Sequence, residues 1–366
     1  MVNNRGPFFS IIIPCCDVEP YVKECLMSVI NQPFEDWECL IGIETCKDRT
    51  EEVIQGIIEG DGRCKVFKGP RSGSCSASRN TGIDLAQGEY VIFLDGDDTI
   101  AEGSLQKLHD KIAAQAGADI YPCAMPVYNE MSGQYEQTRD NYPKDFSEEL
   151  TGPQAVIKTY MVKRDPCPML QLSVFRREYL VSNNLKCIYG LRRQDSEFAP
   201  RALYLAKRVI PIHEAFYIYR IRAQSVSTLA KGVTSFLGDY AIILKSLLAF
   251  HAKVSAQNDF DRRISSMWAK HWLTWVYYNW FYPLNIRKAT RERRMETLKN
   301  AFADGFDNFD CLTKASTLPR RIAAWWVKFF VRHPSGAWVT DLFFSYVYFL
   351  LTDIRDKKQG NRAQRQ

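Results

Sequence analysis

Residues 89–98 read Glu-Tyr-Val-Ile-Phe-Leu-Asp-Gly-Asp-Asp, and this run decides the fold of the chain. The apolar residues from Tyr90 to Leu94 cannot all face water, so they predict a central strand that is covered on both faces. Asp95, Asp97 and Asp98 follow at the carboxyl end of that strand, where open α/β sheets bind their ligands. Carboxylate oxygens at such a place suit Mg²⁺ or Mn²⁺, with substrate phosphates completing the coordination.

A second interpretation of this acidic turn is structural. Asp98 or Thr99 would then cap a helix that begins just after the turn. The Asp-x-Asp spacing alone does not decide between the two, because Asp259-Phe-Asp261 repeats it in a polar segment. The position does favour a metal site, because Asp95 and Asp97 end an apolar strand and follow a stretch of small residues.

Length and composition predict a folded protein of one large or two ordinary domains. The chain has 366 residues, of which 46% are hydrophobic, so it can bury substantial cores. Its eleven Cys include no Cys-x-x-Cys pair, and no two His stand at ligand spacing, so the spacing indicates neither a zinc site nor a disulfide framework. An odd number of Cys without a secretory leader favours reduced thiols and a cytoplasmic protein.

The charge is divided unevenly along the chain. The net charge is +6, yet the residues from Asp261 onward hold nineteen Lys and Arg against nine Asp and Glu. Seven of the eight Trp lie in the same stretch. This division indicates two regions with different partners.

Strand and helix patterns alternate over the first part of the chain. We expect strands at 8–13, 37–43, 64–68, 89–94 and 119–127, and helices at 19–31, 48–58, 77–86 and 104–115. This alternation predicts a mostly parallel sheet with helices on both faces.

The rest of the chain is predicted to be mixed at first and then helical. A hairpin or loop is expected at 129–150, strands at 171–175, 209–212 and 216–221, and helices at 151–161 and 195–206. Further helices are expected at 235–256, 265–281, 289–302 and 319–331. We therefore predict a first domain at 1–232 and a helical, aromatic and basic region at 233–366.

Several blocks, taken together, resemble the family 2 glycosyltransferases of the GT-A fold. They are Ser10-Ile-Ile-Ile-Pro14, Ser76-Ala-Ser-Arg-Asn-Thr-Gly82, Gly88 to Asp98, Gln194-Asp195 with Glu197-Phe198, and Tyr219-Arg-Ile-Arg222. The resemblance covers roughly residues 8–228. It implies a Rossmann-like α/β fold and a nucleotide-sugar-dependent, generally inverting transferase, with 1–232 as the catalytic domain.

The same resemblance implies roles for individual residues. A divalent cation, Mg²⁺ or Mn²⁺, would bind at Asp97 with Asp95, and Asp195 would be the catalytic base. An Asp at a helix start is also a common cap, and Arg79 could pair with a nearby carboxylate instead of the nucleotide. The residues expected to bind the donor nucleotide are Pro14, Cys16, Asp17, Glu44, Arg79, Asp95, Gly96 and Arg222.

This sequence departs from the family pattern in three places. Cys16 and Asp17 stand where the family usually has an aromatic residue and Asn. The second strand keeps only Glu44 of the usual acidic end. Arg222 replaces the His of many relatives and is expected to reach the diphosphate.

The resulting hypothesis is a transferase that moves a sugar, most simply from a UDP-sugar, to a glycan or lipid-linked oligosaccharide of a bacterial surface polysaccharide. A nucleotidyltransferase is one rival, although Cys15-Cys-Asp-Val18 is no Gly-rich phosphate loop. A sugar-nucleotide-binding or scaffold protein without turnover is another. No nucleic-acid partner is expected, because the basic run 291–294 is typical of a solvated helix face.

The carboxyl-terminal region has two interpretations. Residues 319–332 mix bulky aromatics with cations, as in a helix that lies on a membrane surface. The same aromatics could pack the helical region instead. The apolar run 338–352 is too short to span a membrane. The expected location is the cytoplasm. If residues 319–332 lie on a membrane, the protein would contact the inner face of the cell membrane peripherally.

Overall fold

The structure is a computed structural model that describes residues 6–69, 72–140, 142, 148–162, 169–223 and 237–254. The chain divides into two compact units, Met1–Lys231 and Gly232–Gln366. In the second unit, α9 (Leu237–Val254) lies inside the helix expected at 235–256. The helices expected at 265–281, 289–302 and 319–331, and the runs 291–294 and 338–352, lie outside the described residues.

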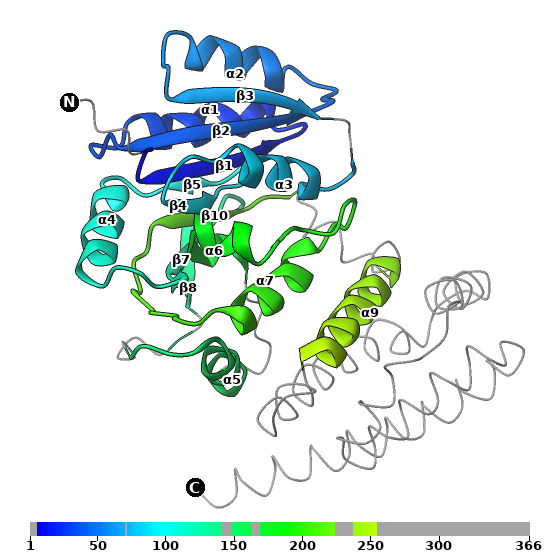
Figure 1. The fold of residues 1–366 in the computed structure, drawn as a ribbon. Coiled ribbons are helices and arrows are strands. Elements are labelled where there is room, and N and C mark those ends of the chain that lie inside the picture. Colours follow the sequence, from blue (N-terminus) through cyan, green and yellow to red (C-terminus); the bar gives the residue numbers. More distant parts are fainter. Residues whose placement is uncertain are drawn as a thin grey trace, which may run out of the picture. The chain divides into compact units, whose positions relative to one another are not determined.

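The first unit is built on a six-stranded sheet (Figure 1). In spatial order the strands are β3 (Cys64–Gly69), β2 (Trp37–Glu44), β1 (Phe9–Cys15), β4 (Tyr90–Phe93), β9 (Ser173–Arg176) and β6 (Ile120–Pro122). The first four are parallel, whereas β9 runs antiparallel to both of its neighbours. The expected mostly parallel sheet is therefore confirmed, with β9 as its antiparallel member.

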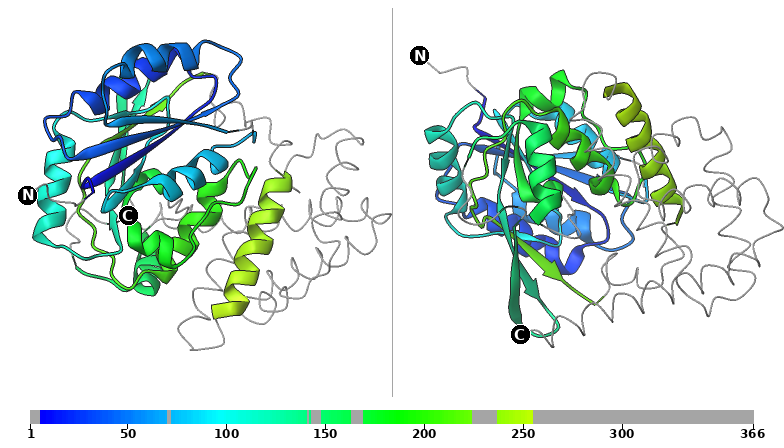
Figure 2. Two further views of the ribbon diagram at one scale, coloured as in Figure 1. Left: turned by 45° about the horizontal axis from the view of Figure 1, so that its top comes forward. Right: turned by 90° about the horizontal axis from the view of Figure 1, so that it is seen from below.

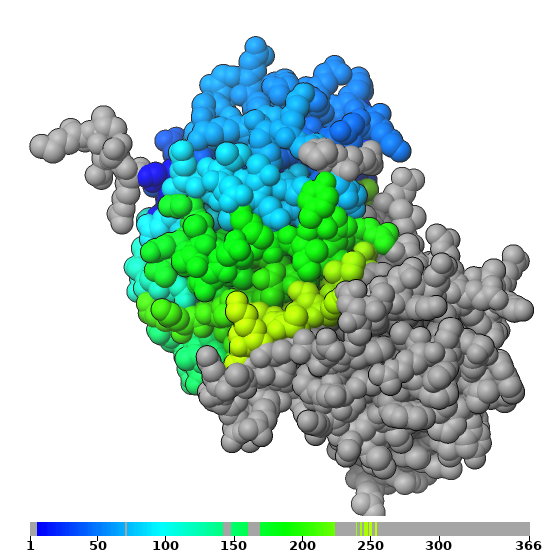
Figure 3. Space-filling model, turned by 45° about the vertical axis from the view of Figure 1, so that its right-hand side comes forward, coloured from blue at the N-terminus to red at the C-terminus, as the bar shows by residue number. Residues whose placement is uncertain are grey.

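Helices cover both faces of this sheet (Figures 1 and 2). They are α1 (Glu19–Ile30), α2 (Thr50–Ile58), α3 (Ser76–Leu85), α4 (Ser104–Ala114), α5 (Gly152–Val162), α6 (Arg177–Ser182) and α7 (Gln194–Leu205), with a 3₁₀ turn at Leu170–Leu172. In the space-filling view, α3 (cyan) and the segment from α6 to α7 (green) form adjacent bands on one face of the unit (Figure 3).

Alternate residues of β1 face opposite layers, as the period of a strand requires. Ile11 and Ile13 belong to one core with Val22 of α1 and Leu108 of α4. Ile12 faces α3, where a methyl group added to Gly82 would lie 2.4 Å from Ile12 Cγ2. Every residue of β1, β2 and β4 is buried, which explains why their sequences are nearly continuous apolar runs.

A second sheet has the order β5 (Thr99–Ile100), β10 (Tyr217–Ile221), β7 (Ala124–Asn129) and β8 (Gln134–Asp140). The hairpin expected after residue 129 is confirmed, because β7 and β8 pair antiparallel. Thr99 also pairs in β5 with β10, and α4 starts only at Ser104. Neither Asp98 nor Thr99 therefore caps a helix directly after the acidic turn.

Two strand predictions were wrong in detail. The single strand expected at 119–127 is divided between the two sheets at Cys123, whose N–H donates to Leu172 O (2.7 Å). The division follows a change of partner, because β6 pairs with β9 and β7 pairs with β8 and β10. The strand expected at 209–212 is reduced to isolated bridges of Val209 with Ile120 and Leu150.

Gly88 precedes β4 at a close backbone approach, and its replacement tests that packing. An added Cβ would lie 2.6 Å from Ser10 N and 2.8 Å from Phe9 C. Because backbone cannot move as a flexible side chain does, Gly88→Ala should lower the free energy of unfolding by about 1–3 kcal/mol. Gly56→Ala is the control, since Gly56 lies in α2 with no atom near the added methyl group. That change should raise stability by up to about 1 kcal/mol in urea denaturation. Equal effects of the two changes would contradict the packing.

The first turns of α7 are fixed by a buried ion pair. Glu197 is 0% exposed and accepts from Arg201 Nε (2.6 Å) and Nη2 (2.8 Å). Arg201→Met should lower the free energy of unfolding by about 3–5 kcal/mol, because it removes the cation that balances the charge of a buried carboxylate. Glu149→Gln breaks an exposed pair with Arg208 and should change little in the same urea titration. A small loss in Arg201→Met would show that Glu197 is compensated in another way.

Candidate functional site

The predicted site residues lie at the carboxyl ends of three neighbouring parallel strands (Figure 1). Cys16 and Asp17 follow β1, Glu44 ends β2, and Asp95 and Asp97 follow β4. The carboxyl ends of these strands meet because the strands are parallel and adjacent. The fold therefore gathers, at the carboxyl ends of these strands, residues as far apart in the sequence as Cys16 and Asp97.

A buried guanidinium group lies at the centre of the site. Arg79, from the first turn of α3, has a side chain that is only 1% exposed. It forms an ion pair with Asp95 through Nη2 and donates from Nη1 to Gln194 Oε1 (2.7 Å). Burial opposes its charge, but the Asp95 carboxylate and other neighbours hold the pKa of Arg79 above its usual value. One side chain thus joins α3, the acidic turn and the start of α7.

This geometry bears on the two alternatives for Arg79. Both terminal nitrogens are used inside the protein, on Asp95 and Gln194. The carboxylate pairing is therefore the one formed in the structure. The burial of the guanidinium favours a positioning role for Arg79 over direct contact with a nucleotide.

Asp95 is held from both sides. One carboxylate oxygen pairs with Arg79, and the other accepts from Gln171 Nε2 (2.7 Å). Its backbone N–H donates to the hydroxyl of Tyr217 (3.2 Å). The side chain remains 26% exposed, so it faces the site with a fixed orientation.

Asp97 differs from Asp95 in its partner. Its side chain is 23% exposed, and Oδ2 accepts from Arg222 Nε (2.9 Å). Burial and the nearby charge of Asp95 raise the pKa of Asp97, while Arg222 opposes this shift. A carboxylate whose charge is destabilised in this way favours the approach of a further cation.

Asp98 is structural. It is 1% exposed and accepts from the Tyr217 hydroxyl and from the backbone N–H of Arg220 (2.7 Å). Burial raises the pKa of Asp98 well above its usual value. Arg220 also donates from Nε to the backbone oxygen of Asp97 (3.0 Å). Asp98 thus fastens β10, and with it Arg220 and Arg222, to the acidic turn.

Asp195 lies in the first turn of α7 and is half-buried. Its carboxylate accepts from the backbone N–H of Ser196 (2.8 Å), but Asp195 is the second residue of α7, and the cap position is held by Arg193. Its neighbour Gln194 carries the bond to Arg79. Glu197, the other carboxylate of this block, is fully buried against Arg201, so Asp195 is the carboxylate of the two that a substrate can reach.

The remaining predicted nucleotide residues differ in accessibility. Glu44 is 4% exposed and accepts from the N–H and the hydroxyl of Ser72 (both 2.9 Å). Pro14 is buried in β1, and a methyl group on Gly96 would lie 3.1 Å from Cys15 Sγ. Pro14 and Gly96 therefore act through backbone and close packing, and they offer a ligand no side-chain donor.

Three site residues escaped the sequence analysis. Gln171 and Tyr217 hold Asp95, and Arg220 holds the acidic turn. For Arg220 a signal existed, because it lies near the end of β10, two positions before Arg222, and alternate residues of an extended chain share a side. Nothing local in the sequence marks Gln171 or Tyr217, since their partner is about eighty or more residues away.

The carboxylates of the acidic turn fit a hard cation that shares its coordination with a substrate. Among the described residues, Asp95 and Asp97 do not belong to a group of three protein ligands within reach of one ion. An ion at Asp97 would therefore take its other ligands from water and from phosphate oxygens, as Mg²⁺ usually does.

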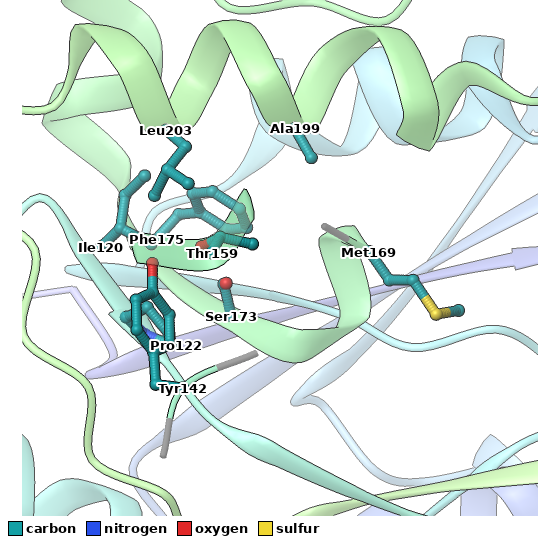
Figure 4. Close-up of a pocket in the computed structure, with 9 residues that line it drawn as sticks. All are labelled: Ile120, Pro122, Tyr142, Thr159, Met169, Ser173, Phe175, Ala199 and Leu203. Carbon is teal, nitrogen blue, oxygen red and sulfur yellow. The ribbon is translucent and has the colours of Figure 1, made fainter. Parts of the chain in front are cut away.

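A small cavity lies elsewhere in the first unit (Figure 4). Its lining combines apolar side chains, including Ile120, Phe175 and Leu203, with the hydroxyl groups of Tyr142 and Thr159. None of the residues of the acidic turn reaches it. It is a packing space between the sheet and the helices α5 and α7.

Comparisons with known proteins agree with this architecture. Residues 10–180 match the family described as Glycosyl transferase family 2. The uncharacterized glycosyltransferase EpsJ of Bacillus subtilis is 31% identical over 229 residues, which are 60% of this chain and 63% of EpsJ. The chain therefore covers less than two thirds of that relative. A GalNAc(5)-diNAcBac-PP-undecaprenol beta-1,3-glucosyltransferase of Campylobacter jejuni is 25% identical over 71% of this chain and 80% of its own length.

Solved structures share the fold. A fragment of S. aureus TarS in complex with UDP-GlcNAc has a TM-score of 0.63 at 17% identity, over 91% of this chain and 92% of that chain. At this identity the likeness concerns the fold, and it confirms the expected GT-A class. The family match therefore identifies residues 10–180 of this chain as a domain of glycosyl transferase family 2.

Proposed function

We propose that the chain transfers one sugar from a nucleoside diphosphate donor, most simply a UDP-sugar, to a glycan or lipid-linked oligosaccharide acceptor. The transfer inverts the anomeric carbon and serves the synthesis of a bacterial cell-surface polysaccharide. The observation that carries the proposal is the connection from Asp95 through Arg79 to Gln194, which ties the acidic turn that carries Asp97 to the start of the helix that carries Asp195.

The named relatives support the substrate classes. The Campylobacter jejuni relative is named for transfer to an undecaprenol-linked glycan, and the name of a shorter match in Bacillus subtilis refers to teichuronic acid biosynthesis. The TarS neighbour was solved with UDP-GlcNAc. A UDP-sugar donor and a lipid-linked acceptor are the simplest combination of these.

The residues divide the chemistry between the two sides of the site. Asp97, with Asp95 beside it, would hold Mg²⁺ or Mn²⁺, an ion that neutralises the charge on a departing diphosphate when bound. Arg222 adds a fixed positive charge at the same carboxylate. Asp195 accepts the proton of the attacking acceptor hydroxyl. Arg79 contributes by fixing the relative positions of these groups.

We assign the donor nucleoside to the carboxyl ends of β1 and β2. Asp17 and Glu44 are the acidic side chains there, and Cys16 lies where the family usually has an aromatic ring. Glu44 is already bound to Ser72, so it orders the loop that follows β3 as well as facing the nucleoside.

A cytoplasmic location with peripheral membrane contact completes the proposal. Among the described residues, no helix is long and apolar enough to cross a membrane. The basic, aromatic segment 319–332 is our candidate for contact with the inner face of the cell membrane.

Metal dependence through Asp97 is testable by binding alone. Asp97→Asn should weaken UDP binding in the presence of Mn²⁺ by at least about tenfold, because the ion loses its protein anchor. EDTA should have the same effect on the unchanged protein. Isothermal titration measures both, and Asp110→Asn on α4 is the control for loss of an exposed Asp. Unchanged UDP affinity after both treatments would rule out a metal-diphosphate site at Asp97.

The role of Asp195 separates turnover from binding. Asp195→Asn should lower the rate of UDP release in the presence of acceptor by roughly 10²- to 10⁴-fold, because the hydroxyl loses its base. Donor affinity and urea stability should hardly change, since Asn has nearly the shape of Asp and its side-chain oxygen can still accept from the Ser196 N–H. Near-normal turnover in this variant would reduce Asp195 to a helix-terminal residue.

A further inference from the structure

A second group of potential metal ligands lies at the carboxyl ends of β1 and β2, where we place the donor nucleoside. Cys16, Asp17 and Cys46 each offer one ligand atom, and these atoms all lie within 4.8 Å of one another. Cys16 and Asp17 follow β1, and Cys46 follows β2. All three residues are half-buried, so the group is open to ions from solvent.

Hydrogen bonds from backbone N–H groups to side chains connect the two turns that carry these ligands. Asp17 Oδ1 accepts the N–H of Lys47 (2.6 Å). The N–H groups of Val18 and Glu19 donate to Thr50 Oγ1 and Asp48 Oδ2 (both 2.9 Å). These cross-links hold the ligands near their final positions before any ion arrives, which lowers the cost of binding.

The backbone at Asp17 supports a specific role for its side chain. Its φ is 53°, in the left-handed region that residues other than glycine rarely adopt. Such a conformation costs free energy and persists where the surrounding structure imposes it, often at binding sites. Here it brings the carboxylate of Asp17 to the two thiols.

The ligand set identifies the kind of ion. We propose that Cys16, Asp17 and Cys46 form a binding site for a soft divalent cation such as Zn²⁺, separate from the hard-oxygen site at Asp97. Thiolate ligands favour Zn²⁺ and disfavour Mg²⁺ and Mn²⁺. Two sulfurs, one carboxylate oxygen and a water complete a tetrahedral shell.

The geometry needs only a small adjustment. Zinc bonds of about 2.3 Å to sulfur and 2.0–2.2 Å to oxygen put tetrahedral ligand atoms about 3.5 Å apart. The present atoms, within 4.8 Å of one another, therefore need to close by roughly 1 Å. The Cys46 thiol donates to Glu44 O (3.1 Å) and the Cys16 thiol to Thr45 O (3.9 Å). Binding replaces these S–H bonds, and each thiol releases one proton as its sulfur joins the ion.

Other thiols near the site lack the same arrangement. Cys15 is buried between β1 and the acidic turn, and burial raises the pKa of its thiol. Cys39 and Cys64 lie side by side in β2 and β3, but no described carboxylate joins them as a third ligand. Cys64, which is half-buried like Cys16, therefore provides a matched control.

Occupancy of this site should oppose nucleotide binding. Cys16 and Asp17 follow β1, at the end of the sheet that we assign to the donor nucleoside. This effect on nucleotide binding rests on the proposed function. An ion that engages both side chains withdraws them from the nucleoside. The site would thus make the enzyme sensitive to free zinc.

The direct test measures metal binding by the full chain, reduced and stripped of metal. Titration with Zn²⁺ should show one site, and Co²⁺ in its place should give a thiolate-to-metal charge-transfer band. Cys16→Ser and Cys46→Ser should each weaken Zn²⁺ binding by at least about tenfold and remove the band, whereas Cys64→Ser should preserve both. Absence of binding, or equal Zn²⁺ affinity in all four proteins, would overturn the site.

A second titration tests the link to the nucleotide. Zn²⁺ should raise the dissociation constant of UDP for the unchanged protein and for Cys64→Ser, but not for Cys46→Ser. Zn²⁺ binding without any effect on UDP affinity would overturn the competition. Zn²⁺ binding by a chain that binds no UDP under any condition would overturn the proposed function and leave the metal site standing.

Discussion

The arrangement of the site depends on one buried cation, the guanidinium of Arg79. Removing a charge from water is costly, and the ion pair with Asp95 together with the bond to Gln194 offsets that cost. A hydrophobic residue would fill the same space at less cost, but it would not fix two loops in register. Since Asp95 precedes Asp97 by two residues and Gln194 precedes Asp195 by one, the position of Arg79 constrains how far apart Asp97 and Asp195 lie, the two carboxylates that we propose for metal binding and proton transfer.

The acidic turn shows how three carboxylates in four residues acquire different properties. Asp98 is sealed by Tyr217 and the backbone of Arg220, so it anchors the second sheet. Asp95 is oriented by Arg79 and Gln171. Asp97 accepts from Arg222 and remains partly exposed. The three carboxylates are chemically the same, and their neighbours make the difference. Asp98 becomes structural, Asp95 is held in a fixed orientation, and Asp97 is suited to a metal ion.

Local signals in the sequence predicted the elements that depend on them. The buried runs of β1, β2 and β4 and the helices that follow them were predicted within a residue or two at most ends, because apolar periodicity is a local property. The antiparallel β9 and the division at Cys123 were not predicted, because each depends on a partner strand far away in the sequence. The predicted carboxylates do gather at the carboxyl ends of neighbouring strands, but their partners Ser72, Gln171 and Tyr217 come from other loops and strands.

The pair formed by Asp97 and Arg222 constrains how a divalent ion can enter. Oδ2 of Asp97 already accepts from Arg222 Nε, and the guanidinium also lies 4.8 Å from the centre of the Tyr21 ring. An ion at this carboxylate must therefore share Asp97 with Arg222 or displace it. Such an ion would add positive charge beside that of Arg222, whose guanidinium also contacts the Tyr21 ring. A diphosphate with its several negative charges is the kind of ligand that an ion held by Asp97 and the guanidinium of Arg222 would attract together.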